Sequence, residues 1–398
     1  MSDLPVKNSV LYRLRDHAVA RLFGGLESLV LLFSTSGGGK KNVILIRLDA
    51  IGDFILWLDA AKEYRRLYPD KRITLLANSI WAELAERLRY WDEVWPIDMA
   101  QLRRHSFYRL RLLRALRRRN FDIAIQPTHS RGFLEGDSLI RASGARERIG
   151  SSGDWSCISP KQKTISDRWY TRLLVASSRR MHELARNAEF MRHLGMEGFD
   201  PAIPKLPSVA ALPSNLKMAG PYLVLFPGAS WSGRQWAPHN FAAIADRLYK
   251  RMGLRAVICG SAKEFELCHQ IAELANVDVL NLAGETSLPH LVEIVRHARL
   301  LISNETSAIH IAAAVETPAV CILGGGHYGR FLPYDIETRG ATAPTAVLHR
   351  MTCFGCNWIC SQPHRPDGPV PCVDAISLQA VLLAAELAAV PMAETSRA

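Results

Sequence analysis

Short apolar runs alternate with longer segments of mixed polarity along most of this chain. Continuous apolar runs of four to eight residues are typical of strands in a parallel sheet, because helices cover both of its faces. The runs predict buried strands at residues 42–48, 73–77, 94–97, 121–126, 222–226, 255–259, 279–281, 300–302 and 319–323. The segments between them predict helices, including one long charged helix over residues 169–194. This alternation predicts an α/β fold with parallel sheets.

A proline-rich stretch divides the pattern into two similar halves. Five prolines fall within residues 200–221, which is typical of a linker or domain-crossing segment. The simplest architecture is therefore two Rossmann-like, doubly wound domains that face each other across a cleft. The expected parts are an N-terminal basic helix and linker (1–41), a first domain (42–205), a linker (206–220) and a second domain (221–398). The second domain includes a Cys-rich segment (353–372) and a terminal helix (376–390).

The chain has 398 residues and a formal net charge of +11, which predicts an anionic partner. Nucleotide, acidic glycan and lipid headgroup all fit this charge. Nucleic acid is disfavoured because no nucleic-acid-binding motif accompanies the basic residues. No secretory signal pattern is visible, and the longest apolar run near the start (29–33) is far below the ~20 residues of a membrane span. We expect a cytoplasmic protein. The basic helix at residues 9–33 either caps its own domain or contacts a membrane surface.

The turn after the first predicted strand holds two carboxylates, in the sequence RLDAIGD. It lacks the G-x-G-x-x-G pattern of a dinucleotide site, which argues against a nicotinamide cofactor. Asp53 lies where a helix begins, and a carboxylate is favoured there by the helix dipole. The same position would also suit a general base that faces a cleft. The spacing leaves both interpretations open.

The loop after strand 222–226 reads PGASWSGRQW. Its glycines would let backbone N–H groups approach a phosphate closely, and an arginine can hold two phosphate oxygens at once. Ser230, Ser232 and Arg234 are the candidate phosphate ligands of this loop. An ordinary surface loop is the alternative.

A strand–helix–strand unit between residues 300 and 326 carries a second group of candidates. The polar turn SNETS precedes a helix, and the next strand ends in three glycines. Phosphates and nucleotides bind at such positions in open parallel sheets. The candidates are Glu305, Thr306, Ser307, His310, Gly324 and Gly325. A helix cap, a structural histidine and a plain loop are the alternatives.

Four of the eight cysteines lie close together near the C-terminus. Their density is typical of metal sites in reducing compartments, with zinc or an iron centre as the expected ion. Four ligands would leave no open position, so we expect a structural metal. Reduced thiols without metal are the alternative. The cysteines are Cys353, Cys356, Cys360 and Cys372.

Three segments together resemble glycosyltransferase family 9, the heptosyltransferase family, which has the GT-B fold. They are RLDAIGD, PGASWSGRQWAPHNFAAIA and SNETSAIHIAAAVETPAVCILGG. The resemblance implies that Asp53 is the catalytic base and that Arg234 grips the donor diphosphate, where many members have lysine. The family's Asp-Thr-Gly-x-x-His pattern maps onto Glu305, Thr306, Ser307 and His310. Two positions depart from it, Glu305 for aspartate and Ser307 for glycine, and both lie at the implied donor pocket.

The resemblance implies an inverting glycosyl transfer from a nucleoside-diphosphate sugar, with no metal required for catalysis. In this family the first half receives the acceptor, commonly a phosphorylated, lipid-linked saccharide. Arg47, Arg103 and Arg104 are then candidate acceptor ligands, and the arginine-rich segment 103–119 would contact acidic acceptor or the inner face of the plasma membrane. A solvated helix face is the alternative for that segment. A sugar-nucleotide epimerase and a non-enzymatic basic protein that binds glycan or membrane remain alternative functions.

Overall fold

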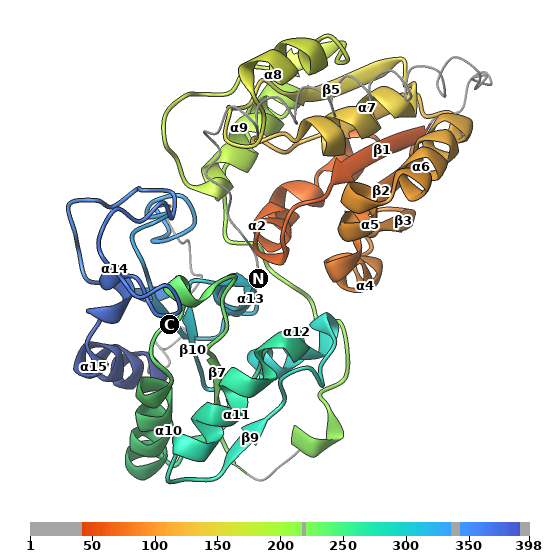
Figure 1. Ribbon diagram of the computed structural model, residues 1–398. Helices are drawn as coiled ribbons and strands as arrows, with labels where there is room; N and C mark the ends of the chain where they lie inside the picture. Colours follow the sequence, from red (N-terminus) through yellow and green to blue (C-terminus); the bar gives the residue numbers. More distant parts are fainter. Residues whose placement is uncertain (1–41, 217–219, 336–342, 391–398) are drawn as a thin grey trace. The chain divides into compact units, whose positions relative to one another are not determined.

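The computed structural model describes residues 42–216, 220–335 and 343–390 (Figure 1). The expected N-terminal basic helix lies outside these residues. Contacts divide the chain into two units. The first holds the chain up to Ala50 together with Lys62–Ser178 and Glu189–Glu197, and the second holds Ile51–Ala61, Arg179–Ala188 and the chain from Gly198 onward. The predicted α/β class with two doubly wound sheets is confirmed.

The first unit is built on a six-stranded sheet in which every strand pair is parallel. The strand order is β3-β2-β1-β4-β5-β6. The strands are β1 (Asn42–Arg47), β2 (Arg72–Asn78), β3 (Glu93–Ile97), β4 (Ile123–Gln126), β5 (Glu147–Ser151) and β6 (Arg172–Leu174). The helices of this part of the chain are α2 (Ile51–Ala61), α3 (Tyr64–Leu67), α4 (Ser79–Arg87), α5 (Met99–Arg104), α6 (Ser106–Arg119), α7 (Ser138–Ser143), α8 (Pro160–Asp167) and α9 (Glu183–Leu194), with a π-helical turn at Phe133–Asp137.

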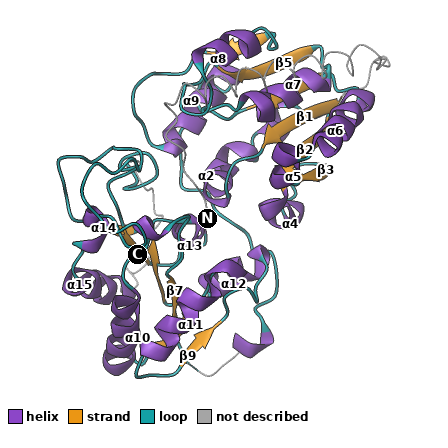
Figure 2. Cartoon of the chain, in the orientation of Figure 1, coloured by secondary structure: helices purple, strands orange, loops and turns teal. Residues whose placement is uncertain are grey.

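The second sheet repeats this plan with the order β12-β11-β10-β7-β8-β9, again all parallel. Its strands are β7 (Tyr222–Phe226), β8 (Arg255–Ile258), β9 (Val279–Asn281), β10 (Leu300–Asn304), β11 (Ala319–Ile322) and β12 (Thr345–Val347). The helices are α10 (Pro238–Met252), α11 (Phe265–Leu274), α12 (Leu288–Arg296), α13 (Ser307–Ala314), α14 (Pro371–Asp374) and α15 (Leu378–Ala389), with 3₁₀ turns at Ser214–Leu216, Ser232–Arg234 and Ala262–Glu264. In Figure 2 the helices of each unit flank its strands.

Both sheets reverse their strand order at one point, between β1 and β4 in the first and between β7 and β10 in the second. Open α/β sheets bind their ligands at such a reversal, outside the carboxyl ends of the strands. The loops that leave β7 and β10 carry the candidate phosphate ligands of the second half. The topology therefore brings together two segments that are more than 60 residues apart in sequence.

Buried apolar side chains fix both sheets between their helices. In the first unit Ile44, Leu76 and Ala124 belong to one buried cluster. In the second unit Leu225, Ile244 and Ile302 belong to another. The central strands β1, β4, β10 and β11 are buried on both of their faces, which explains why the sequence shows continuous apolar runs there.

The expected helix over residues 169–194 is wrong in its first half. Residues Arg172–Leu174 form β6 at the edge of the first sheet, paired with β5, and the helix begins only at Glu183. β5 and β12 also escape the apolar pattern. β12, like β6, is an edge strand. An edge strand is open along one side, so charged and polar residues are tolerated there and the apolar signal is lost. β5 lies inside its sheet, but its first two residues are only half-buried and are charged. Among the described residues no helix has the length and apolarity needed to cross a membrane.

Candidate functional site

The loop between β7 and α10 is fastened to the end of β10 by Asn304. Its Nδ2 donates a hydrogen bond to the carbonyl of Pro227 (2.6 Å), and its Oδ1 accepts one from the backbone N–H of Trp236 (3.1 Å). Asn304 is fully buried, so these two bonds satisfy its amide inside the protein. The segment from Pro227 to Trp236 is thereby held against the carboxyl end of its neighbouring strand.

Arg234 lies inside this segment and reaches the turn after β10. Its Nη2 donates to the backbone carbonyl of Glu305 (2.6 Å), and its Nη1 donates to Oγ of Ser230 (3.1 Å). The Glu305 carboxylate lies 3.7 Å from Nη2, and the guanidinium lies 4.7 Å from the ring centroid of Trp358. The structure thus brings together Arg234, Ser230 and Glu305, three of the candidate donor ligands. Ser232 opens the 3₁₀ turn that carries Arg234.

Glu305 is buried, and within the described residues neither of its carboxylate oxygens has a hydrogen-bond partner. Burial raises the pKa of this carboxyl to about 7, and the charge of Arg234 opposes the rise. Near neutral pH the group therefore exists in both protonation states. It can accept a hydrogen bond from a ligand hydroxyl or, when protonated, donate one to a phosphate oxygen.

Helix α13 begins beside Glu305. Thr306 caps it, with Oγ1 accepting from the N–H of Ala308 (3.4 Å), and Ser307 is the first helical residue. His310 is buried, and its Nδ1 is hydrogen-bonded to the hydroxyl of Tyr334 (2.8 Å). Burial, with a smaller contribution from His182, lowers the pKa of His310 to about 3, so its imidazole is neutral. Both Thr306 and His310 have partners inside the protein.

Asp53 lies in the first turn of α2 and is half-buried. The preceding Gly52 packs directly on α13: a Cβ at Gly52 would lie 3.1 Å from Cδ2 of His310 and 3.7 Å from Cα of Ser307. This contact places the start of α2 beside the start of α13 within the second unit. The expected base therefore lies next to the helix that carries three of the expected donor ligands.

The Cys-rich segment packs on the glycines that follow β11. Gly324 and Gly325 are buried, and the rings of Trp358 and Phe354 lie against them. Cys372 is buried, and its Sγ accepts a hydrogen bond from the N–H of Gly325 (3.4 Å). This arrangement ties the cysteine cluster to the same edge of the sheet as Arg234.

Burial raises the pKa of the Cys372 thiol; the Gly325 N–H opposes this, and Cys356, Cys353 and Cys360 add smaller increases. The other three thiols therefore lie near enough to Cys372 to act on it. In the part of the chain that the structure describes, however, no three His, Cys, Asp or Glu side chains are arranged to hold a metal ion. The donor atoms suit zinc or iron, but their present positions do not form a ligand set.

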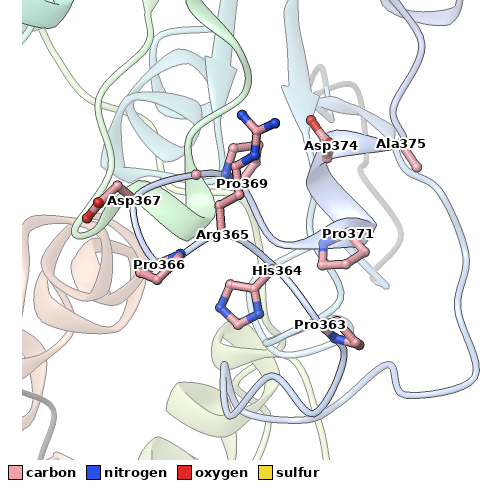
Figure 3. A pocket seen from close by; sticks show the side chains of 10 residues that line it. Pro363, His364, Arg365, Pro366, Asp367, Pro369, Pro371, Asp374 and Ala375 are labelled. Carbon is pink, nitrogen blue, oxygen red and sulfur yellow. The ribbon is translucent and has the colours of Figure 1, made fainter.

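A hollow of about 890 Å³ adjoins the Cys-rich segment (Figure 3). Prolines and the polar residues His364, Arg365 and Asp367 line it. The ring centroid of His364, which lines the hollow, lies 6.4 Å from that of Trp231 in an edge-on arrangement. The hollow therefore lies beside the loop that holds Arg234. Its lining is mostly exposed loop, so it marks an open border of the site.

The candidate acceptor ligands of the first unit differ from one another in burial and in their surroundings. Arg47 is buried, and its Nε lies 2.7 Å from the Asp49 carboxylate. Arg103 is exposed and forms an ion pair with Glu135 at 2.7 Å, and Arg104 is exposed at the end of α5. Arg47 and Arg103 thus pair with different carboxylates.

The sequence interpretation missed polar residues that follow β4 and β5. Thr128 Oγ1 lies 3.4 Å from both carboxylate oxygens of Asp49, and Ser130 Oγ donates to Asp154 (3.2 Å). Nε2 of His129 lies 3.7 Å from the same Asp154 carboxylate. The available signal was the run THS directly after a predicted strand, at the edge where parallel sheets bind ligands.

Two Rossmann-like units, each with one strand-order reversal, define an α/β protein of the GT-B type. The comparison with known proteins then identifies the family. The family model of glycosyltransferase family 9 (heptosyltransferase) matches residues 109–350, more than half of the chain. The chain belongs to this family and is a glycosyltransferase.

Relatives and solved structures agree with this assignment. The chain is 23% identical to lipopolysaccharide heptosyltransferase 1 of Pseudomonas aeruginosa over 78% of its own length and 87% of the relative's. The glycosyl transferase family 9 structure from Veillonella parvula has a TM-score of 0.67 and 17% identity, covering 87% of this chain and 97% of the other. The ADP-heptose lps heptosyltransferase II of E. coli has a TM-score of 0.63 and 19% identity, with 87% and 98% covered.

One further structural neighbour bears on the cysteines. The iron-containing dodecameric glycosyltransferase TibC of E. coli has a TM-score of 0.51 and 13% identity, covering 89% of this chain and 79% of the other. At this identity the likeness concerns the fold alone.

Proposed function

We propose that this protein is an inverting glycosyltransferase that moves heptose or a related sugar from a nucleoside-diphosphate sugar to a lipopolysaccharide or other surface-glycan acceptor. The observation that carries the proposal is the Arg234–Glu305 cluster at the point where the second sheet reverses its strand order. A guanidinium held beside a helix N-terminus matches the charge of a diphosphate.

In the proposed reaction Asp53 takes the proton from an acceptor hydroxyl as that oxygen attacks the anomeric carbon. Attack comes from the face opposite the leaving group, a new glycosidic bond forms, and the bond from the anomeric carbon to the diphosphate oxygen breaks. The nucleoside diphosphate leaves with the electron pair. Arg234, backbone N–H groups near Ser230 and Ser232, and the start of α13 stabilise the negative charge that develops on it.

The donor is proposed to be an ADP-sugar of the heptose type. Support comes from the structural similarity to the ADP-heptose lps heptosyltransferase II of E. coli. Glu305 and Ser307 stand where the family pattern has aspartate and glycine, and both border the proposed pocket. Glu305, Thr306, Ser307, His310, Gly324 and Gly325 are proposed to shape this pocket, so the two departures would adjust which sugar and base it accepts.

The acceptor is proposed to be a lipid-linked or phosphorylated glycan that meets the first unit. Arg103 and Arg104 supply positive charge there, and the exposed arginines of α6 (Arg111, Arg114 and Arg118) extend it. Arg47 is buried and paired with Asp49, so it adds no charge to this surface. Such a surface would hold the enzyme peripherally at the cytoplasmic face of an anionic membrane. No nucleic acid is proposed as a partner.

A structural zinc or iron ion at Cys353, Cys356, Cys360 and Cys372 is kept as a separate proposal. The four thiols would have to move into a tetrahedral set, and the ion would hold the Cys-rich segment on the sheet. Elemental analysis of the purified protein tests this. About one zinc or iron ion per chain, lost in Cys356→Ser, supports it, and metal-free, fully folded protein contradicts it.

The donor site is tested by titrating wild type and Arg234→Gln with a panel of nucleoside-diphosphate sugars in a calorimeter. We expect one donor to bind wild type and to bind Arg234→Gln about 10- to 100-fold more weakly, since a hydrogen-bonded charge is lost. Arg251→Gln, at an exposed arginine on α10, is the matched control and should bind normally. If no donor in the panel binds, the proposal fails.

Product analysis separates the alternatives. A transferase consumes the donor only when acceptor is present and leaves a product of inverted anomeric configuration. An epimerase would convert the donor without acceptor. If cells that carry Asp53→Ala still made the surface glycan at the wild-type level, the result would instead support a non-enzymatic role.

A further inference from the structure

The Cys-rich segment is bound to the glycine run after β11 through its backbone. The N–H of Gly355 donates to the carbonyl of Gly325 (2.8 Å), and the N–H of Asn357 donates to the carbonyl of Gly326 (3.0 Å). Asn357 and Trp358 both have left-handed backbone conformations, with φ of 53° and 61°. Such conformations are unfavourable for residues with side chains and cluster at functional sites.

The glycines make room for the ring of Trp358. A Cβ at Gly324 would lie 2.4 Å from Cη2 of Trp358, and a Cβ at Gly326 would lie 2.2 Å from its Cδ2. No real side chain tolerates such distances, so only glycine at these positions lets the indole lie where it does. The glycine run therefore acts as a seat for Trp358.

The seated indole lies under Arg234. The guanidinium is 4.7 Å from the ring centroid, and the rings of Trp231 and His327 meet the indole edge-on at 6.4 Å and 6.1 Å. A cation over an indole face is held by the ring quadrupole. Trp358 thus fixes the orientation of Arg234, the residue proposed to bind the diphosphate.

Several buried polar atoms of this cluster lack hydrogen-bond partners among the described residues. They are Nε1 of Trp358, Nε of Arg234 and both carboxylate oxygens of Glu305. Buried polar groups are normally satisfied, and each exception needs an explanation. The N–H groups of Trp358 and Arg234 come from two different loops and could donate hydrogen bonds to the phosphate oxygens of a nucleotide. The Glu305 carboxylate could accept hydrogen bonds from its ribose hydroxyls.

We infer that Trp358 is a donor-binding residue: its indole supports Arg234, and its Nε1–H donates a hydrogen bond to an oxygen of a bound nucleoside diphosphate. This inference rests on the proposed function. It makes the Cys-rich segment a part of the donor site, because that segment carries Trp358 to Arg234. It also gives the glycine run a role other than direct contact with phosphate.

The test is calorimetric titration of the full chain with ADP, comparing wild type, Trp358→Phe and Trp358→Leu. Phenylalanine keeps an aromatic ring on the glycine seat but has no N–H. We expect the Kd for ADP to rise about five- to tenfold in Trp358→Phe, the effect of one lost hydrogen bond, and further in Trp358→Leu. Trp155→Phe, at an exposed tryptophan, is the matched control and should leave the Kd unchanged.

A merely structural role predicts that Trp358→Phe, with an unchanged melting temperature, binds ADP like wild type, and that result overturns the inference. Tighter binding of ADP by Trp358→Leu also overturns it, because the indole would then obstruct the site. The proposed function fails separately, if wild type binds neither ADP nor any other nucleoside diphosphate.

Discussion

The carboxyl edges of the two sheets carry similar residues but neutralise them differently. In the first unit Arg47 is ion-paired with Asp49, and buried Arg131 contacts both Asp137 and Asp167. In the second unit Arg234 lies 3.7 Å from a Glu305 carboxylate that accepts no hydrogen bond from the described residues. The first edge thus closes its charges through ion pairs in which Arg131 is shared by two acidic side chains, although Nη1 of Arg131 and Oδ2 of Asp137 lack hydrogen-bond partners among the described residues. At the second edge one arginine faces one carboxylate, and both oxygens of that carboxylate lack a hydrogen-bond partner among the described residues.

Under the proposed function, this difference fits a division of labour between the units. Charges that are already paired contribute to stability and to a fixed surface, whereas unsatisfied groups reduce stability and gain partners on binding. An anionic leaving group belongs with the second arrangement. The first edge offers hydroxyls and a histidine, which suit a polyhydroxylated acceptor.

The largest expected effect comes from Asp53, which follows strand β1 of the first sheet in sequence but belongs to the second unit. Asp53→Asn should lower the turnover number by about 10²–10⁴-fold, because the amide cannot accept the proton of the acceptor hydroxyl. The Kd for ADP should stay unchanged. Steady-state kinetics together with calorimetry measure both quantities. Asp70→Asn, at an exposed aspartate, is the control, and equal activity of the two variants would contradict the assignment.

The contrast between the edges predicts unequal losses of stability. Arg131→Met should lower the free energy of unfolding by about 3–5 kcal/mol, since it leaves the buried Asp137 without its cation. Arg234→Met should cost less than about 2 kcal/mol, because Arg234 faces one carboxylate, which can take up a proton, whereas Arg131 is shared by Asp137 and Asp167. Urea denaturation followed by circular dichroism measures both. Equal losses would show that the two edges do not differ as described.

Glu305 should make stability depend on pH. Its pKa rises from 4.5 to about 7 on folding, so the folded state binds the proton more tightly than the unfolded state. Stability is therefore full below about pH 4.5 and falls as the pH rises through 7. Glu305→Gln should remove this fall and gain at most about 3 kcal/mol at pH 8.

A buried but satisfied carboxylate provides the control for Glu305. Glu293 accepts the N–H of Val209 (2.8 Å) and pairs with Arg296 (3.1 Å), so Glu293→Gln should destabilise the protein by about 1–3 kcal/mol. Denaturant midpoints from pH 5 to pH 8 measure both variants. A stability that is independent of pH in wild type, or the same sign of change in both variants, would refute the role given to Glu305.

The smallest expected effect concerns the exposed basic surface of the first unit. Arg104→Gln should change the free energy of unfolding by less than about 0.5 kcal/mol, since the side chain is exposed. Partitioning onto vesicles that contain phosphatidylglycerol should fall about fivefold, as expected for one arginine near an anionic surface. Vesicle sedimentation at low and high salt measures this. Arg87→Gln, on α4, is the control, and identical partitioning of all three proteins would exclude Arg104 from a membrane contact.

The sequence predicts most of the fold because the central strands are continuous apolar runs. Strand β7 (YLVLF) matches its predicted bounds, and β10 is found two residues longer than predicted. The edge strand β6 was mistaken for helix because its three residues include an exposed arginine and carry too little apolar signal.

That Arg234 and Glu305 lie close together could also be predicted from the sequence, because the loops after neighbouring parallel strands lie side by side. Trp358 was not. Its position depends on two successive left-handed residues and on the close approach of a ring to glycines more than 30 residues earlier. The pattern of apolar and polar residues cannot predict such a contact, because the contact depends on the path of an irregular loop.

The contact between Gly52 and His310 has a consequence for engineering. A single methyl group at residue 52 would stand 3.1 Å from the imidazole carbon, so the helices would have to separate by a few tenths of an ångström. Alanine at this position would therefore act as a steric spacer that shifts the neighbouring aspartate without altering any charge. The position of Asp53 therefore depends on how closely α2 and α13 pack at Gly52.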